Sequence, residues 1–164
     1  MTKPSILIAR AIPPAVEAFL QQHFEVQTNP DDTVWSPEQL RQRLQGKDGV
    51  LTTGSERVDA ELLSACPQLK VVANMAVGYN NFDVQAMTQA GVQGTNAPNV
   101  LTETTADFGF ALLMAAARRV TESEHYLRAG LWNKWSYDMF AGAEVHGSTL
   151  GIIGMGRIGQ GIAK

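Results

Sequence analysis

The chain has 164 residues and a mass of 17.8 kDa, and a length of roughly 150 residues is typical of one domain. Apolar residues make up 45% of the sequence and charged residues 18%, a balance that is typical of folded globular proteins and excludes a disordered tail. The formal net charge of −3 and the isoelectric point near 5.6 argue against a nucleic-acid-binding protein.

The single cysteine, Cys66, cannot form an internal disulfide, which favours a reducing compartment. We expect Cys66 to be a small core residue. No apolar stretch approaches the roughly 20 residues that a bilayer crossing needs, and the first residues lack a signal-peptide cleavage pattern. These features predict a cytoplasmic protein that has no membrane partner.

Over the first 98 residues, short apolar strands alternate with helices. The expected strands are residues 5–9, 24–26, 49–53, 70–75 and 92–97. The expected helices begin near Pro14, Pro37, Ala60 and Asp83. Strands that alternate with helices at intervals of about 20 residues predict βαβ units and a parallel sheet.

Three of these helices are preceded by residues that commonly cap a helix N-terminus. Ser36 can cap a helix whose first residue is proline, and Gln39 has the spacing of a capping box. Gly46 is the matching stop signal. Asp59 and Asp83 are the expected caps of the next two helices.

Beyond Pro98 the composition changes, and we expect one long helix over residues 101–129. Its centre is apolar on nearly every side, which predicts burial in a core or against a partner subunit. At its start, Thr104 and Asp107 have the spacing of a capping box. Thr105 could instead direct its hydroxyl at a bound cofactor, and spacing alone favours capping.

A glycine-rich turn, GMGRIG at residues 154–159, follows an expected strand at residues 149–153. In a dinucleotide-binding fingerprint of this form, the first glycine permits the tight turn and the second lets the backbone approach a pyrophosphate. The third allows the helix to pack close to the strand. The alternative is a glycine turn without a ligand. The acidic residue that would select NAD is expected beyond Lys164, so the turn leaves NAD and NADP open.

The turn VGYNNFD at residues 77–83 follows another expected strand. Successive backbone N–H groups in such a turn can form a nest for an anion such as a carboxylate, although spacing alone favours an ordinary turn capped by Asp83. None of the three histidines, His23, His125 and His146, has metal-ligand spacing. We therefore assign no metal site and no catalytic acid or base to this chain.

Together these motifs, in this order, resemble the D-isomer-specific 2-hydroxyacid dehydrogenases. The resemblance rests on residues 77–83, 96–107, 116–120 and 150–159, and it covers the whole chain. Within the family the chain is most similar to the glyoxylate/hydroxypyruvate reductases, including their 2-ketogluconate reductase branch.

The resemblance implies an α/β fold with a flavodoxin-like parallel-sheet substrate domain at residues 1–98, which lacks its closing segment. Residues 99–164 would begin a Rossmann NAD(P)-binding domain. Thr53 and the backbone of Val77 and Gly78 would hold the substrate. Thr105 would lie by the nicotinamide. The residues that would cradle the pyrophosphate are Gly154, Gly156, Arg157, Ile158 and Gly159.

The activity that the resemblance implies is NAD(P)H-dependent reduction of glyoxylate, hydroxypyruvate or 2-ketogluconate to the D-2-hydroxyacid. The cofactor would be NADP or NAD, and the branch favours NADPH. Residues 101–129 would form a homodimer interface. The family's catalytic arginine, glutamate and histidine are absent from these 164 residues, so we expect the chain to be an inactive fragment. The alternatives are a dinucleotide-sensing corepressor, a phosphoglycerate dehydrogenase or a D-lactate dehydrogenase.

Overall fold

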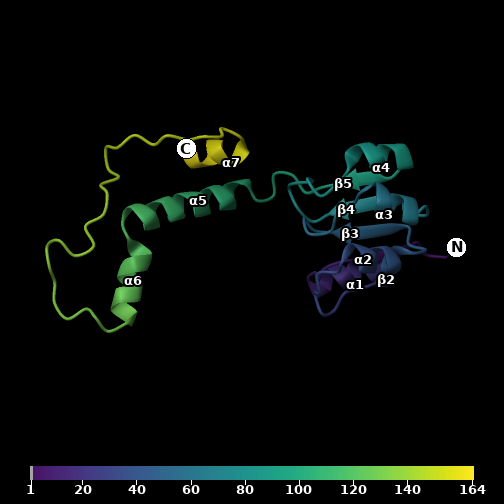
Figure 1. Ribbon diagram of the computed structural model, residues 1–164, viewed down its shortest axis with the longest axis horizontal. Helices are drawn as coiled ribbons and strands as arrows, with labels where there is room; N and C mark the ends of the chain where they lie inside the picture. The colour runs from purple at the N-terminus through teal and green to yellow at the C-terminus, as the bar shows by residue number, and fades with distance from the viewer. Residues whose placement is uncertain (1) are drawn as a thin grey trace. The chain divides into compact units, whose positions relative to one another are not determined.

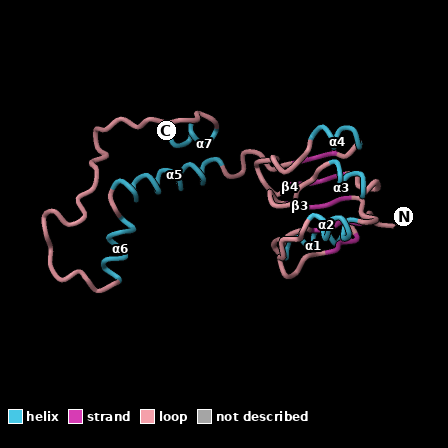
Figure 2. The backbone as a smooth tube through the Cα atoms, viewed as in Figure 1, coloured by secondary structure: helices cyan, strands magenta, loops and turns pink. Residues whose placement is uncertain are grey.

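The computed structural model describes residues 2–164 and divides the chain into two compact units, Met1–Val100 and Leu101–Lys164. The first unit contains strands and helices that alternate along the chain (Figures 1 and 2). Its elements are β1 (Ser5–Ile8), α1 (Pro14–His23), β2 (Glu25–Gln27), α2 (Pro37–Leu44), β3 (Gly49–Thr52), α3 (Ala60–Ala65), β4 (Val71–Asn74), α4 (Val84–Ala90) and β5 (Gln93–Thr95). The α/β fold class and the alternation that the sequence predicts are confirmed.

The five strands form one parallel sheet in the order β2-β1-β3-β4-β5. This strand order is the flavodoxin-like one, in which ligands bind outside the carboxyl ends of the strands. The register places Leu7 beside Val50 and Val50 beside Val72. These three side chains therefore form one row across the middle of the sheet.

The main core lies between this row and the helices α2, α3 and α4. Leu7, Val50 and Val72 are at most 3% exposed, and burying such a side chain contributes about 1.5–3 kcal/mol. They pack in one cluster with leucines of α2 and α3 and with Met87 of α4. Cys66 is a buried member of the same cluster, which confirms its prediction as a core residue.

Local sequence signals set the ends of the helices in this unit. The Ser36 hydroxyl accepts a hydrogen bond from the Gln39 N–H at 3.2 Å, and the Gln39 side chain accepts one from the Ser36 N–H at 3.0 Å. This reciprocal pair is the predicted capping box. Asp59 and Asp83 cap α3 and α4 as predicted. Gly46 follows α2 with a φ of 74°, which is suited to glycine.

The second unit contains three helices, α5 (Thr102–Ala117), α6 (Val120–Arg128) and α7 (Arg157–Ala163). The prediction of one continuous helix over residues 101–129 is wrong. The helix breaks because the Ala117 carbonyl accepts its hydrogen bond from the Ala143 N–H, at 2.8 Å. Arg119 then takes a left-handed φ of 54°, which turns the chain into α6.

The predicted capping box at the start of α5 is also wrong. The cap position is Leu101, and no side chain caps this end. Because the helix starts at Thr102, Thr104 is already in the first turn, and its hydroxyl donates to the Leu101 carbonyl at 3.3 Å. Asp107 therefore has no cap residue three positions before it to complete the motif.

The strand predicted at residues 149–153 does not form. Residues 101–164 contain no strand, so this segment has no neighbour to which its backbone can hydrogen-bond. A strand depends on such pairing, whereas a helix satisfies its own backbone groups. Ile153, in this segment, is fully exposed.

Small residues let α5 and α7 approach closely. A Cβ atom added to Gly161 would lie 2.8 Å from the Ala106 Cβ, and one added to Gly109 would lie 3.0 Å from Ile162 Cδ1. The rest of α5 is less covered, since Phe108 and Leu112 are 63% and 54% exposed. Within residues 101–164, this apolar helix therefore keeps much of its surface free.

Candidate functional site

A buried polar network joins the carboxyl ends of β3 and β4. The Thr52 hydroxyl donates to Asn74 Oδ1 at 3.0 Å, and Asn74 Nδ2 donates to the Gly78 carbonyl at 2.8 Å. Thr52 and Asn74 are 1% and 3% exposed. Buried polar groups that are fully hydrogen-bonded hold one arrangement, because leaving any of them unpaired costs about 1–3 kcal/mol.

Asn81 links the loop after β3 to the loop after β4. Its Nδ2 donates to the carbonyls of Thr53 and Glu56, at 3.0 and 2.8 Å. Its Oδ1 accepts a hydrogen bond from Asn74 Nδ2 at 3.2 Å. The loops that carry the predicted substrate residues Thr53, Val77 and Gly78 are thus tied together by two asparagine side chains.

Glu56 organises the loop after β3 and is 5% exposed. Its Oε2 accepts hydrogen bonds from the Thr53 N–H at 2.7 Å and from the Thr53 hydroxyl at 3.0 Å. Its Oε1 accepts one from the Ser55 hydroxyl at 2.9 Å. The Thr53 hydroxyl is therefore already engaged by its own loop.

Arg10, just after β1, joins the loop after β3 to the loop after β2. Its Nη1 donates to Ser55 Oγ at 2.9 Å, while Nε and Nη2 donate to the two oxygens of Asp32 at 2.8 and 2.9 Å. These bonds from Arg10, with one from the Ala11 N–H, lower the pKa of Asp32 to about 2. Asp32 in turn orients the guanidinium group.

Val77 and Gly78 lie in an exposed turn that follows β4. Within residues 2–164, neither of their backbone N–H groups donates a hydrogen bond. A Cβ atom added to Gly78 would meet nothing within 4 Å. The turn thus offers two backbone donors on an open surface, the arrangement with which main-chain nests hold anions.

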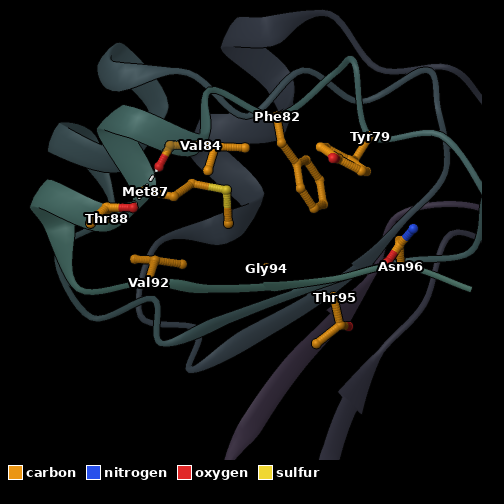
Figure 3. Close-up of a pocket in the computed structure, with 9 residues that line it drawn as sticks. All are labelled: Tyr79, Phe82, Val84, Met87, Thr88, Val92, Gly94, Thr95 and Asn96. Atoms are coloured by element: carbon orange, nitrogen blue, oxygen red, sulfur yellow. Dashed lines mark hydrogen bonds between the residues drawn. The ribbon is translucent and has the colours of Figure 1, made fainter.

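A cavity of about 330 Å³ lies beside this turn, between α4 and β5. Tyr79 and Asn96 lie at one end of it, and Thr88 and Val92 at the other (Figure 3). A Cβ added to Gly94 would lie 2.9 Å from Met87 Cε and 3.2 Å from the Phe82 ring, so a side chain there would have to displace both. The cavity walls combine apolar side chains with polar ones such as Tyr79, Thr88 and Asn96. The two backbone donors without an acceptor belong to the turn beside it.

The glycine turn of the second unit has a distinct geometry at each glycine. Gly154 has a φ of 100°, which other residues rarely adopt, and a Cβ added to Gly156 would meet nothing within 4 Å. A Cβ on Gly159 would lie 2.1 Å from the Gly154 carbonyl oxygen. The three glycines therefore provide the turn, an open backbone surface and close packing of α7, as a pyrophosphate-binding turn requires.

The remaining predicted residues of this unit lie on helices. Thr105 is exposed in the first turn of α5, while Arg157 and Ile158 are the first two residues of α7. No cluster of three His, Cys, Asp or Glu side chains in residues 2–164 could hold a metal ion. Across the same residues, no helix has both the length and the apolar character needed to cross a membrane.

Sequence reasoning missed Arg10, Glu56, Asn74 and Asn81, which hold the two loops in place. Asn74 belongs to the expected strand at residues 70–75 and Asn81 to the turn at residues 77–83, and neither was singled out for a role of its own. A polar residue at the end of an apolar strand, as Asn74 is, was the available signal. The carboxylate bonds of Glu56 stay within its own loop, to Thr53 and Ser55, so Glu56 could have been found from the local sequence. The bonds of Arg10 to Asp32 and Ser55 depend on the strand order, which the local sequence does not specify.

The chain matches the family model described as the catalytic domain of D-isomer specific 2-hydroxyacid dehydrogenases, over residues 6–150. It is 43% identical to a glyoxylate reductase of Thermococcus kodakarensis and 46% identical to one of Thermococcus onnurineus. Each match covers 99% of this chain and 50% of the relative. The chain therefore spans about half the length of the curated relatives that it matches.

The chain is also similar to solved structures of such enzymes. A putative D-isomer specific 2-hydroxyacid dehydrogenase from a Polaromonas species superposes with a TM-score of 0.90 at 34% identity, over 98% of this chain and 51% of that one. An NADPH-dependent glyoxylate/hydroxypyruvate reductase from Sinorhizobium meliloti, in complex with NADP and malonate, superposes with a TM-score of 0.77 at 30% identity. That match covers 99% of this chain and 49% of the other.

Proposed function

This chain belongs to the D-isomer specific 2-hydroxyacid dehydrogenase family, and from that premise we propose that the protein in its full reading frame reduces a small 2-oxoacid. The substrates we propose are glyoxylate, hydroxypyruvate and 2-ketogluconate, each giving the D-2-hydroxyacid. Similarity to glyoxylate reductases supports the first of these. The electron donor is NADPH or NADH, and the NADPH-dependent relative favours NADPH.

The observation that carries this proposal is the turn after β4. The N–H groups of Val77 and Gly78 donate to no acceptor within residues 2–164, and both residues are exposed. Every 2-oxoacid carries a carboxylate, which is a strong acceptor for such donors. In this proposal the two amides bind the substrate carboxylate, and Thr53 lines the same pocket.

The glycine turn fits the dinucleotide that the family uses, because the backbone at Gly156 is open to a close approach. Gly154, Gly156, Arg157, Ile158 and Gly159 would hold the pyrophosphate, and Thr105 would lie by the nicotinamide. When bound, the nicotinamide supplies the hydride for the reduction. The residues of the turn contribute N–H donors and a surface without side chains.

This chain's part in the reaction is binding rather than proton transfer. In this proposal the family's catalytic arginine, glutamate and histidine lie outside residues 1–164, so we expect purified material that ends at Lys164 to show no turnover. We also propose that the protein is cytoplasmic and that residues 101–129 form a homodimer interface. The exposed apolar surface of α5 supports the interface.

The test is to express the full reading frame and to follow NADPH and NADH absorbance with each of the three acids. Pyruvate and 3-phosphohydroxypyruvate serve as comparison substrates, because they report D-lactate and phosphoglycerate dehydrogenase activity. We expect turnover with at least one of the three proposed acids and weaker turnover with the comparison acids. Oxidation of neither cofactor with any 2-oxoacid would contradict the proposal.

A further inference from the structure

Three consecutive carbonyl groups in the turn after β4 each accept a hydrogen bond from this chain. The Ala76 carbonyl accepts from the Ala97 N–H at 2.9 Å, and the Val77 carbonyl accepts from Asn96 Nδ2 at 2.7 Å. The Gly78 carbonyl accepts from Asn74 Nδ2 at 2.8 Å. The turn is therefore held through its acceptors, while its donors at Val77 and Gly78 remain unused within residues 2–164.

Holding the carbonyls also sets the direction of the N–H groups. A trans peptide unit is planar, so its N–H points away from its C=O. The carbonyls of Ala76 and Val77 both turn toward the adjacent residues Asn96 and Ala97. The N–H groups of Val77 and Gly78, which belong to the same two peptide units, must therefore face the opposite side together.

The pairing of β4 and β5 places Asn96 within hydrogen-bonding distance of the Val77 carbonyl. β5 pairs with β4 in register, with Thr95 beside Ala73, so Asn96 follows the end of β5 next to the end of β4. Its side chain lies at the same end of the cavity as Tyr79 (Figure 3). Its amide group makes one hydrogen bond within residues 2–164, the bond to the Val77 carbonyl.

We propose that Asn96 is a positioning residue for carboxylate binding, because it fixes the peptide unit that presents the Gly78 N–H. This inference rests on the proposed function and extends it to a residue outside the turn. Asn96 does not touch the ligand. Because Asn96 orders the turn beforehand, the turn loses less conformational entropy when the two N–H groups bind a carboxylate.

The test compares two isosteric substitutions in the full reading frame. Asn96→Leu removes the amide that holds the Val77 carbonyl. Thr88→Val is the matched control, because it removes a hydroxyl that donates to the Val84 carbonyl at 2.8 Å in the same cavity wall but not in the turn. Both side chains are at least partly exposed, so both variants are expected to fold.

We expect Asn96→Leu to raise the KM for the 2-oxoacid by about three- to tenfold, the factor that the loss of one ordering hydrogen bond gives. The KM for NAD(P)H and kcat should stay within about twofold, and Thr88→Val should change neither KM. A merely structural role for Asn96 predicts the reverse, with a lower melting temperature and an unchanged KM. That result would overturn the inference.

A second readout keeps this inference separate from the reductase proposal. Glyoxylate is titrated into isotope-labelled protein while the Val77 and Gly78 amide resonances are followed. We expect saturable shifts that need about three- to tenfold more glyoxylate in Asn96→Leu. These shifts would support the role of Asn96 even if no 2-oxoacid were reduced, whereas equal saturation in both proteins would refute it.

Discussion

Arg10 connects three loops at the carboxyl edge of the sheet. Its guanidinium group binds Asp32 in the loop after β2 and Ser55 in the loop after β3, while Asp32 also accepts from the Ala11 N–H. A bidentate pair of this kind fixes direction as well as distance. The pair thereby supports the loop that carries Thr53 from the side opposite to Asn81.

The Arg10–Asp32 pair predicts a defined loss of stability in acid. The folded-state pKa of Asp32 is about 2, below its ordinary value of 3.8. A depressed carboxyl pKa contributes stability above the unfolded-state value, and this contribution is lost as the pH falls toward 2. The difference in unfolding free energy between the wild type and Asp32→Asn, measured by urea denaturation, should therefore shrink between about pH 4 and pH 2.

Asp31 provides the control for the loss of a negative charge in this loop. It is the neighbouring carboxyl residue, and it makes no hydrogen bond or ion pair through its side chain within residues 2–164. Asp31→Asn removes a negative charge without removing a hydrogen bond or an ion pair, so at pH 6 it should lower the unfolding free energy less than Asp32→Asn does. A wild-type to Asp32→Asn difference that stays constant from pH 6 to pH 2 would contradict the assignment.

At the level of single elements, most local signals act as predicted, with the capping box at Thr104 as the exception. The features that depend on distant partners were missed. The caps Ser36 and Asp59 act on residues three positions away, so their signals are complete in the sequence. The break after Ala117 depends on Ala143, far along the chain. The strand at residues 149–153 failed for the same reason, since pairing needs a second strand.

The candidate site divides in the same way. The glycine turn and the turn at residues 77–83 were recognisable as motifs, because their backbone requirements are written in consecutive residues. The hydrogen bonds that hold the turn at residues 77–83 were not recognisable in the sequence. Asn96 reaches the Val77 carbonyl only because β5 lies beside β4. Strand order is a property of the whole sheet, and local patterns do not encode it.

The glycine turn predicts different consequences for the same substitution at two glycines. Gly159→Ala should destabilise the second unit by about 1–3 kcal/mol, because the new Cβ would lie 2.1 Å from the Gly154 carbonyl oxygen. Gly156→Ala should leave stability nearly unchanged, since its φ of −74° suits any residue and its surroundings are open. Thermal unfolding of both variants checks this difference.

Gly156→Ala should nevertheless weaken NAD(P)H binding at least about tenfold, the factor that 1.4 kcal/mol gives. The measurement is a fluorescence titration of NAD(P)H with the full reading frame. Unchanged affinity in a folded Gly156→Ala protein would contradict the proposed role of this turn.

At the scale of the whole molecule, the 164 residues correspond to about half of each curated relative. A length typical of one domain therefore coincides here with two compact units, and α5 leaves large apolar side chains uncovered. Apolar patches of this kind commonly mark subunit interfaces. The proposed homodimer would cover this surface by the same patch on each subunit, as two-fold symmetry requires.

A charge placed on α5 should weaken the proposed dimer. Phe108 is 63% exposed on α5, and Phe19 is 58% exposed on α1, so Phe19→Asp is a control of matched exposure. Sedimentation equilibrium of the full reading frame should show Phe108→Asp shifted toward monomer while Phe19→Asp remains dimeric. A wild-type protein that is monomeric throughout, or a Phe108→Asp protein that dimerises normally, would refute the interface.

The proposed activity is reduction of the C2 carbonyl of a 2-oxoacid with D stereochemistry. Its most direct test is the reduction of hydroxypyruvate by the full reading frame, with NADPH or NADH deuterated at the transferable position, followed by mass spectrometry and chiral chromatography of the product. We predict D-glycerate that carries deuterium at C2. L-glycerate, or glycerate without deuterium at C2, would contradict it.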